Sequence, residues 1–242
     1  MRLIFPGTKG EIEEESPEHR FHSNLLIYHK NTSLIIDLGE KYSPELYISL
    51  NKFDAMLITH AHPDHYIWTK RSEDAVNIPV YLTEETLNYT GSKPVNFKII
   101  KAEKEFNIND INICAYNVIH SLRCPAVCYR IKGNRTLIYA PDILDIENPK
   151  ELVFKGVDVL IADGSSVNVN MVRRRDDKLF GHAMIKTIVN WCKKYNIKRL
   201  LITHCGKQIV TGNKREIEEM ISAYSEGAVD WQIAYDGFEV EV

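Results

Sequence analysis

Apolar residues gather in short runs along this chain, and polar or turn-forming residues separate the runs. Runs of this kind, bounded by Gly, Pro, Asn or Asp, are typical of buried β-strands. They predict strands at 2–5, 24–30, 33–39, 55–60, 80–83, 97–102, 111–119, 126–131, 136–141, 158–163, 199–204 and 231–236. The chain is therefore expected to be rich in β-structure.

A helical period of apolar residues appears in two later segments. Apolar residues there recur three or four positions apart, as on one face of a helix. They are Ile185, Ile188, Val189, Cys192 and Tyr195 in the first segment, and Ile217, Met220, Ile221 and Tyr224 in the second. Shorter helices are predicted at 44–50 and from about Asp64 onward. Because strands come in series with helices between them, we expect sheets that pack on each other and are covered by helices.

One four-residue segment, Leu-Ile-Thr-His, occurs at 57–60 and again at 201–204. Each copy closes a predicted strand with a histidine, His60 in the first and His204 in the second. The repeat suggests two related αβ halves whose strand ends meet at one site. A length of 242 residues fits this arrangement as a single domain over 1–242.

The composition is that of an ordinary globular protein, with 44% hydrophobic and 26% charged residues. A net charge of −3 does not fit a protein that coats nucleic acid non-specifically. No apolar run approaches the roughly 18 residues that a membrane span needs. The first apolar segment is too short for a signal peptide. No membrane partner and a cytoplasmic location are therefore expected.

The five cysteines are odd in number and scattered, and they form no Cys-x-x-Cys pair. A disulfide framework is therefore not expected. Two interpretations remain for Cys114, Cys124 and Cys128. They are core residues of predicted strands, or they hold a metal ion.

Three histidines and an aspartate lie close together in the segment HAHPDH at 60–65. Imidazole and carboxylate groups are ligands that zinc and similar ions take. His60 and His62 are two positions apart, so in an extended chain both point toward one ion. Pro63 then breaks the strand, and this turns Asp64 and His65 toward a second ion. Two ions about 3.5–4 Å apart are usual in hydrolytic two-metal sites.

Other strand ends extend this pattern. His120 follows the run that ends at Ile119, Asp142 follows the segment LIYAP, and His204 follows LIT. Together with HxHxDH at 60–65, these residues resemble the metallo-β-lactamase superfamily of metal-dependent hydrolases, and Asp37 in IIDLG matches an early aspartate of that family. The resemblance runs from the first predicted strand to about Gly206. It implies an α/β (α+β) fold, a four-layer αββα sandwich with the metal site at one edge of two mixed β-sheets.

The resemblance also implies two divalent metal ions. Zn(II) suits the ligand types, and Mn(II) or Fe(II) accepts the same donors. The implied ligands are His60, His62 and His120 for one ion, Asp64, His65 and His204 for the other, and Asp142 as a bridge. A water between the ions is expected to become hydroxide and act as the nucleophile. Asp37, Thr59 and Thr203 are candidates to hold ligating histidines, although β-propensity also explains both threonines.

His182 is needed by neither ion and precedes the helix predicted from Ile185. The pattern LIADGSS…GHAMI resembles the branch of ribonuclease Z-like and phosphoribosyl cyclic phosphodiesterase-like enzymes, where a histidine before this helix serves the chemistry. We match His182 to that residue and Asp163 to its carboxylate partner, and we assign both to catalysis with Asp64. Such an imidazole binds a phosphoryl oxygen or protonates the leaving group. A surface histidine and a turn aspartate are the simpler interpretations.

The favoured function is a dinuclear metal-dependent phosphodiesterase that acts on a small or cyclic phosphodiester or on a short nucleic acid end. A hydrolase of thioesters, lactones or other carbonyl compounds is the alternative, and a non-catalytic metal-binding module is a third interpretation. A homodimer is expected from the family. Arg173–Arg175 and His22 are candidates for substrate contact, and Tyr66 with Trp68 for narrowing the cleft, although solvation or core packing also explains them.

Overall fold

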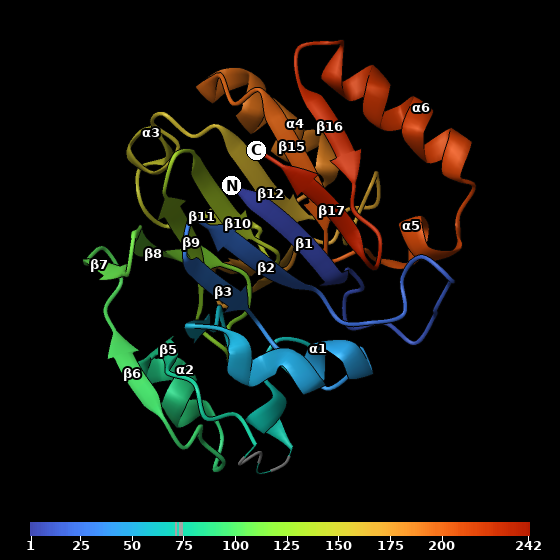
Figure 1. Ribbon diagram of the computed structural model, residues 1–242. Helices are drawn as coiled ribbons and strands as arrows, with labels where there is room; N and C mark the ends of the chain where they lie inside the picture. Colours follow the sequence, from blue (N-terminus) through green and yellow to red (C-terminus); the bar gives the residue numbers. More distant parts are fainter. Residues whose placement is uncertain (71, 73–74) are drawn as a thin grey trace.

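Two β-sheets form the centre of the computed structural model, and helices lie outside them (Figure 1). The structure describes residues 1–70, 72 and 75–242. Within these ranges the predicted strands are present, and the sheets also contain strands that the apolar pattern does not predict. The arrangement is the expected four-layer αββα sandwich.

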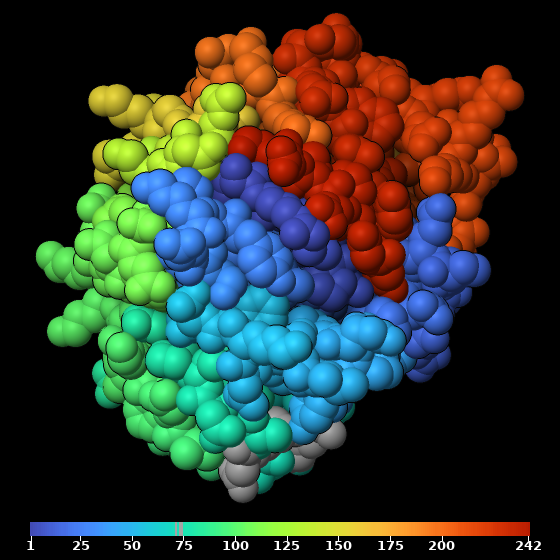
Figure 2. All heavy atoms as spheres, in the orientation of Figure 1, coloured from blue at the N-terminus to red at the C-terminus, as the bar shows by residue number. Residues whose placement is uncertain are grey.

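The first sheet joins the two ends of the chain. In spatial order its described strands are β17 (Phe238–Glu241), β1 (Arg2–Gly7), β2 (Asn24–His29), β3 (Thr32–Ile36), β4 (Ala55–Leu57), β5 (Val80–Thr83) and β6 (Phe97–Ile100). Strands from β17 to β3 pair antiparallel, and those from β3 to β6 pair parallel. Figure 2 shows the N-terminal and C-terminal segments side by side on one face.

The second sheet carries the later strands. In spatial order the described strands are β11 (Asp145–Ile146), β8 (Ile111–Ile119), β9 (Ala126–Lys132), β10 (Thr136–Ala140), β12 (Val159–Asp163), β15 (Arg199–Thr203) and β16 (Asp230–Ile233), with β7 (Glu105–Ile108) also paired to β8. Strands β10, β12, β15 and β16 run parallel, so the ends of the first three open at the same edge. A separate hairpin joins β13 (Arg173–Arg175) to β14 (Lys178–Phe180).

Successive residues of each strand serve different layers of the core. Leu34 and Ile36 of β3 pack between the two sheets, whereas Ile35 packs against the outer helices. In β12 the same alternation places Ile161 between the sheets and Leu160 on the outer face. Both faces of these strands are therefore covered, which explains why their sequences read as continuous apolar runs.

Short helices and two longer ones cover the sheets. The described helices are α1 (Pro44–Ser49), α2 (Glu84–Tyr89), α3 (Lys150–Val153), α4 (Ile185–Tyr195), α5 (Lys207–Thr211) and α6 (Lys214–Ser225), with 3₁₀ turns η1 (Leu50–Lys52) and η2 (Ile67–Thr69). Helix α4 buries Ile188 and Val189 and ends at Asn196 in a left-handed conformation. The side chain of Asn213 accepts two backbone N–H groups at the start of α6.

The helix predicted from about Asp64 is wrong. Residues 62–65 form a turn, in which the Tyr66 N–H donates to the carbonyl of His62, and only the 3₁₀ turn η2 follows. The carbonyls of Pro63 and His65 accept hydrogen bonds from Glu40 and Leu38. These bonds tie the turn to the segment after β3, so its carbonyl groups are not available to continue a helix.

All five cysteines are buried and free. Within the described part of the chain, none of them belongs to a cluster with metal-ligand geometry, so the core interpretation of Cys114, Cys124 and Cys128 holds there. In the same part of the chain, no helix combines the length and the apolar character needed to cross a membrane.

Replacing Ile188 by alanine is expected to lower the free energy of unfolding by about 2–4 kcal/mol, because the side chain is buried between α4 and the second sheet. Ile48 of α1 is 78% exposed and provides the matched control, for which a change within about 0.5 kcal/mol is expected. Urea denaturation measures both values. Equal losses in the two variants would contradict this assignment of the core.

Candidate metal centre

The ends of four strands bring the expected ligands to one edge of the two sheets. The loop after β4 and the segments after β8, β10 and β15 supply His60, His62, Asp64, His65, His120, Asp142 and His204. Their donor atoms form two groups, within each of which the atoms lie within 4.8 Å of one another, and Asp142 belongs to both. A third group of the same size joins Asp142 and His204 to Asp163 and His182. The repeated Leu-Ile-Thr-His segment therefore delivers one histidine to each group.

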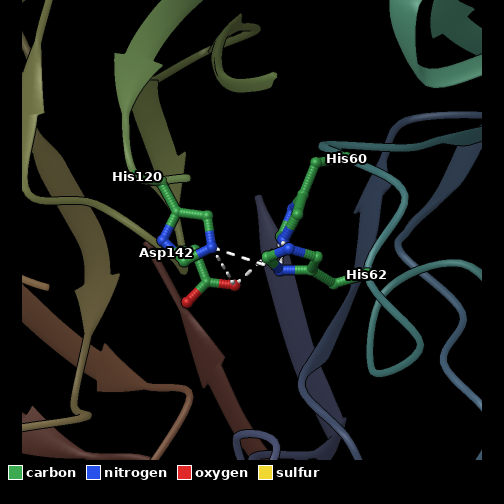
Figure 3. Close-up of side chains that lie close together, drawn as sticks. All are labelled: His60, His62, His120 and Asp142. Carbon is green, nitrogen blue, oxygen red and sulfur yellow. Dashed lines mark hydrogen bonds and ion pairs between the residues drawn. The ribbon is translucent and has the colours of Figure 1, made fainter. Parts of the chain in front are cut away.

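The first group consists of three histidines that face Asp142 (Figure 3). Nε2 of His60 lies 3.0 Å from Nδ1 of His62, and Nε2 of His120 lies 3.2 Å from that same atom. The Oδ2 atom of Asp142 lies 3.3 Å from Nε2 of His60. Three imidazole nitrogens and one carboxylate oxygen thus converge on a small space, a donor set that suits zinc.

The second group places His65 and His204 around two carboxylates. Oδ2 of Asp64 lies 3.2 Å from Nε2 of His65 and 2.9 Å from Nε2 of His204. Asp142 approaches the same histidines, with Oδ2 at 2.8 Å from Nε2 of His65 and Oδ1 at 3.2 Å from Nδ1 of His204. Asp142 therefore stands between the two groups.

The histidines of the two groups differ in their electrostatics. Burial lowers the pKa of His60 well below its ordinary value and that of His120 to about 4, so these imidazoles are neutral and free to donate lone pairs. Burial opposes charge on His204 as well, but the carboxylates of Asp142, Asp163 and Asp64 outweigh it and raise the pKa of His204 to about 10. The second group thus concentrates negative charge that favours a cation.

Two buried atoms of the cluster have unused bonding capacity. Among the described residues, neither Nε2 of His65 nor Oδ1 of Asp142 has a hydrogen-bond partner with acceptable geometry. A buried polar atom left unsatisfied costs about 1–3 kcal/mol, so native proteins rarely leave one without a reason. Metal coordination would satisfy both atoms, and the residues present therefore fit the divalent ions that the fold implies.

Asp37 fixes the orientation of His65. Its Oδ2 atom accepts a hydrogen bond from Nδ1 of His65 at 2.8 Å, which leaves Nε2 facing the carboxylates. Thr59 donates to Asp37 through its N–H at 2.7 Å and its hydroxyl at 2.9 Å. The hydroxyl of Thr203 instead lies 2.8 Å from that of Ser23. Asp37 and Thr59 thus support the cluster as expected, whereas the contact of Thr203 is with Ser23.

His182 reaches the cluster from the segment before α4. Its Nδ1 atom lies 2.7 Å from Oδ2 of Asp163 and 3.3 Å from Oδ1 of Asp142. Asp163 is fully buried, and its oxygens also accept the backbone N–H groups of Ile143 and Ser165. Burial acts to lower the pKa of His182, but the Asp163 carboxylate outweighs burial and raises it. His182 is thus largely buried rather than on the surface, and Asp163 both turns the chain through Ser165 and pairs with His182.

Tyr66 and Trp68 do not narrow the cleft. Both side chains are fully buried and pack with Ile58 in the core cluster outside the first sheet, so the hypothesis that they face the substrate is wrong. The isolated bridge between Leu38 and Tyr66 holds the backbone in this position. Both side chains therefore serve the packing of the core.

The other candidates for substrate contact are engaged with neighbouring residues of the chain. Arg173–Arg175 form the exposed strand β13, where Arg174 pairs with Asp177 at 3.3 Å. His22 is buried, and its Nδ1 atom accepts the N–H of Lys41. Ser165 was not predicted, yet its hydroxyl lies 2.9 Å from Nδ1 of His204. The two serines that follow Gly164 in ADGSS are the sequence signal that points to it.

A cavity of about 800 Å³ opens over the two groups. The side chains of His62, Asp64, His120, Asp142, His182 and His204 all line it. Its volume lies within the range of small-molecule sites. The cavity is therefore large enough to admit a small molecule beside the ligand candidates.

A family model described as the beta-lactamase superfamily domain matches residues 37–205, well over half of the chain. The chain belongs to the metallo-β-lactamase superfamily. A model of the anti-Pycsar protein Apyc1 matches residues 1–67. The family resemblance and the αββα fold expected from the sequence are confirmed. The superfamily consists of metal-dependent hydrolases, and its fold implies divalent ions.

Individual relatives share the fold at low sequence identity. Ribonuclease Z of Methanopyrus kandleri is 26% identical over 143 residues, or 54% of this chain and 50% of that protein, so the match spans about half of the curated relative. The metallo-beta-lactamase fold protein YhfI from Bacillus subtilis superposes with a TM-score of 0.71 at 18% identity, covering 100% of this chain and 99% of that one. Human tRNase Z, short form, gives 0.67 at 16% identity, with 100% and 99% covered. A diphosphatase from the PhnP family gives 0.68 at 16% identity, with 100% and 97% covered.

Divalent metal is expected to raise the unfolding temperature of metal-stripped protein by about 5–10 °C at a free concentration a hundredfold above Kd, because the ions bind the folded cluster. Scanning calorimetry measures the shift. His62→Ala and His204→Ala each remove a donor and are expected to reduce it, whereas the control His29→Ala, in β2, keeps it. A full shift in both site variants would show that the ions bind elsewhere.

Proposed function

We propose that this chain is a two-metal phosphodiesterase that acts on a small or cyclic phosphodiester or on a short nucleic acid end. The observation that carries the proposal is the His182–Asp163 pair, whose imidazole stands at the ligand cluster without being needed by either group. Phosphodiester cleavage develops negative charge on the phosphoryl oxygens and on the leaving oxygen. A second polar group beside the metals is suited to that distribution of charge.

The ligand sets follow from the two groups of donors. His60, His62 and His120 would hold one ion, Asp64, His65 and His204 the other, and Asp142 would contribute to both. When bound, the ions supply an activated water as nucleophile and neutralise charge on the phosphoryl group. Nitrogen-rich donors with carboxylates favour Zn(II), and Mn(II) or Fe(II) accepts the same set.

His182 has the geometry of a proton donor or of a phosphoryl-oxygen ligand. Asp163 occupies Nδ1 of the ring, so Nε2 is the atom available to a substrate in the cavity. The bonds from the N–H groups of Ile143 and Ser165 hold the Asp163 carboxylate in place, and through it the imidazole. Asp64, which lines the cavity between His65 and His204, is assigned to catalysis with this pair.

Several of the relatives support phosphoester chemistry. The curated relative is a ribonuclease Z, and the structural neighbours include a tRNase Z and a diphosphatase. Hydrolysis of a thioester, lactone or other carbonyl compound is the competing proposal, because the same cluster would stabilise a tetrahedral oxyanion. The homodimer expected from the family stays a prediction.

Replacing His182 by alanine is expected to lower kcat on phosphodiesters by about 10²–10⁴-fold, since a positioned acid or base contributes that much. The loss is expected to be larger for a diester with an alkoxide leaving group than for bis(4-nitrophenyl) phosphate. An alkoxide is more basic than 4-nitrophenolate, so its departure depends more on protonation. Steady-state kinetics of metal-loaded protein gives both values, with His29→Ala as the control.

Two results would overturn the proposed function. One is full activity of His182→Ala on both diesters, which would remove the residue from the chemistry. The other is turnover of a thioester or lactone by the unaltered protein with no turnover of any diester, which would make the chain a carbonyl hydrolase.

A further inference from the structure

Part of the cavity wall over the ligand cluster is apolar. Ile12, Pro63, Val169 and Met171 contribute to its lining. Val169 is 53% exposed, and Ile12 and Met171 are half-buried. Apolar side chains that stay exposed together at a concave site are typical of a binding surface.

The segment that carries Ile12 is held rigidly. Lys9 is fully buried, and its ammonium group donates to the Ile12 carbonyl at 3.3 Å and to Glu15 at 3.1 Å. Lys41 donates to the same Glu15 carboxylate at 2.8 Å. A buried ammonium group is costly unless it is paired, so these bonds must persist in the folded protein. The bond from Lys9 thus supports the backbone at Ile12.

The segment that carries Val169 and Met171 is also tied down. The hydroxyl of Ser166 accepts the N–H of Val169 at 3.0 Å and donates back to the carbonyl of the same residue. Oε1 of Gln208 accepts the N–H of Val167 at 3.0 Å. Because both apolar segments are preformed, little ordering entropy is lost when a rigid group binds between them and the metal ligands.

The same lining offers almost no free positive charge for a second phosphate. Apart from the ligand candidates and His182, the charged side chains that line the cavity within the described residues are Glu11 and Lys207. Lys207 already pairs with Glu14. Recognition of phosphate ordinarily uses arginine or lysine donors. Glu11 would instead repel an additional anionic group.

We propose that Ile12, Val169 and Met171 bind an uncharged ring on one ester arm of the substrate, and that the substrate carries a single phosphodiester group. This inference rests on the proposed function and narrows its substrate class. An aryl ring and a nucleobase share the required chemistry. A diphosphate, or a nucleic acid strand with further phosphates in the cavity, does not.

Two diesters that share 4-nitrophenolate as the leaving group test the apolar wall. In the unaltered protein kcat/KM for 4-nitrophenyl phenyl phosphate is expected to exceed that for 4-nitrophenyl methyl phosphate. Val169→Ala and Met171→Ala are each expected to lower the phenyl-to-methyl ratio by about tenfold, as loss of an apolar contact does. Val172→Ala is the matched control, because Val172 is exposed on the same loop but does not line the cavity. An unchanged ratio in both lining variants would overturn the proposal.

A binding measurement separates this proposal from the proposed function. Calorimetry of metal-loaded protein is expected to show phenylphosphonate binding about tenfold more tightly than methylphosphonate, with the preference lost in Met171→Ala. Preference without any diester hydrolysis would contradict the phosphodiesterase and leave the ring site standing. Diester hydrolysis with no preference for the phenyl compound in either measurement would support the phosphodiesterase and contradict the ring site.

Two nucleotide esters test whether the substrate carries a single phosphate and whether its ring is a nucleobase. The 4-nitrophenyl ester of thymidine 5′-phosphate is compared with the same ester that carries an additional 3′-phosphate. The extra phosphate is expected to lower kcat/KM by about tenfold, because Lys207 of the lining already pairs with Glu14 and Glu11 repels the added charge. An increase would overturn the limit. Faster turnover of the thymidine ester than of the phenyl ester identifies the ring as a nucleobase, and the opposite order as an aryl group.

Discussion

The burial of three carboxylates in one cluster of imidazoles is the constraint on which this site depends. Asp64, Asp142 and Asp163 are each at most 4% exposed and lie among six histidines. Carboxylates cannot be buried together unless cations or donors compensate them. The carboxylates raise the pKa of His65 and of His204, so these imidazoles offset part of the charge, and divalent ions would offset it more fully. The cluster is therefore built for positive charge.

The fold meets this constraint by ending its strands at one edge. Strands β10, β12 and β15 run parallel in the second sheet, and the segments that follow them deliver Asp142, Asp163 and His204 together. Strand β4 of the first sheet delivers His60 to the same place. Asp37 holds His65 by a hydrogen bond, and backbone N–H groups hold Asp163. A rigid scaffold thus aims every donor before an ion or substrate arrives.

The sequence predicted most of the centre because its signals are local. Histidines and aspartates follow several predicted strands directly, and the HxHxDH segment follows another. The two sheets determine where these residues lie. Prediction was wrong where tertiary contacts decide the outcome. Hydrogen bonds to residues 38 and 40 prevent a helix after Asp64, and the core takes Tyr66 and Trp68. The apolar wall escaped notice because Ile12 and Met171 lie in loops, where no periodicity marks the exposed face.

Anomalous X-ray scattering from crystals of metal-loaded protein tests the two-metal centre directly, because it locates ions independently of activity. Two ions about 3.5–4 Å apart are expected. One would lie within His60, His62 and His120, the other within Asp64, His65 and His204, and Asp142 would contact both. Ions found outside these groups, or a single ion at full loading, would contradict the two-metal centre.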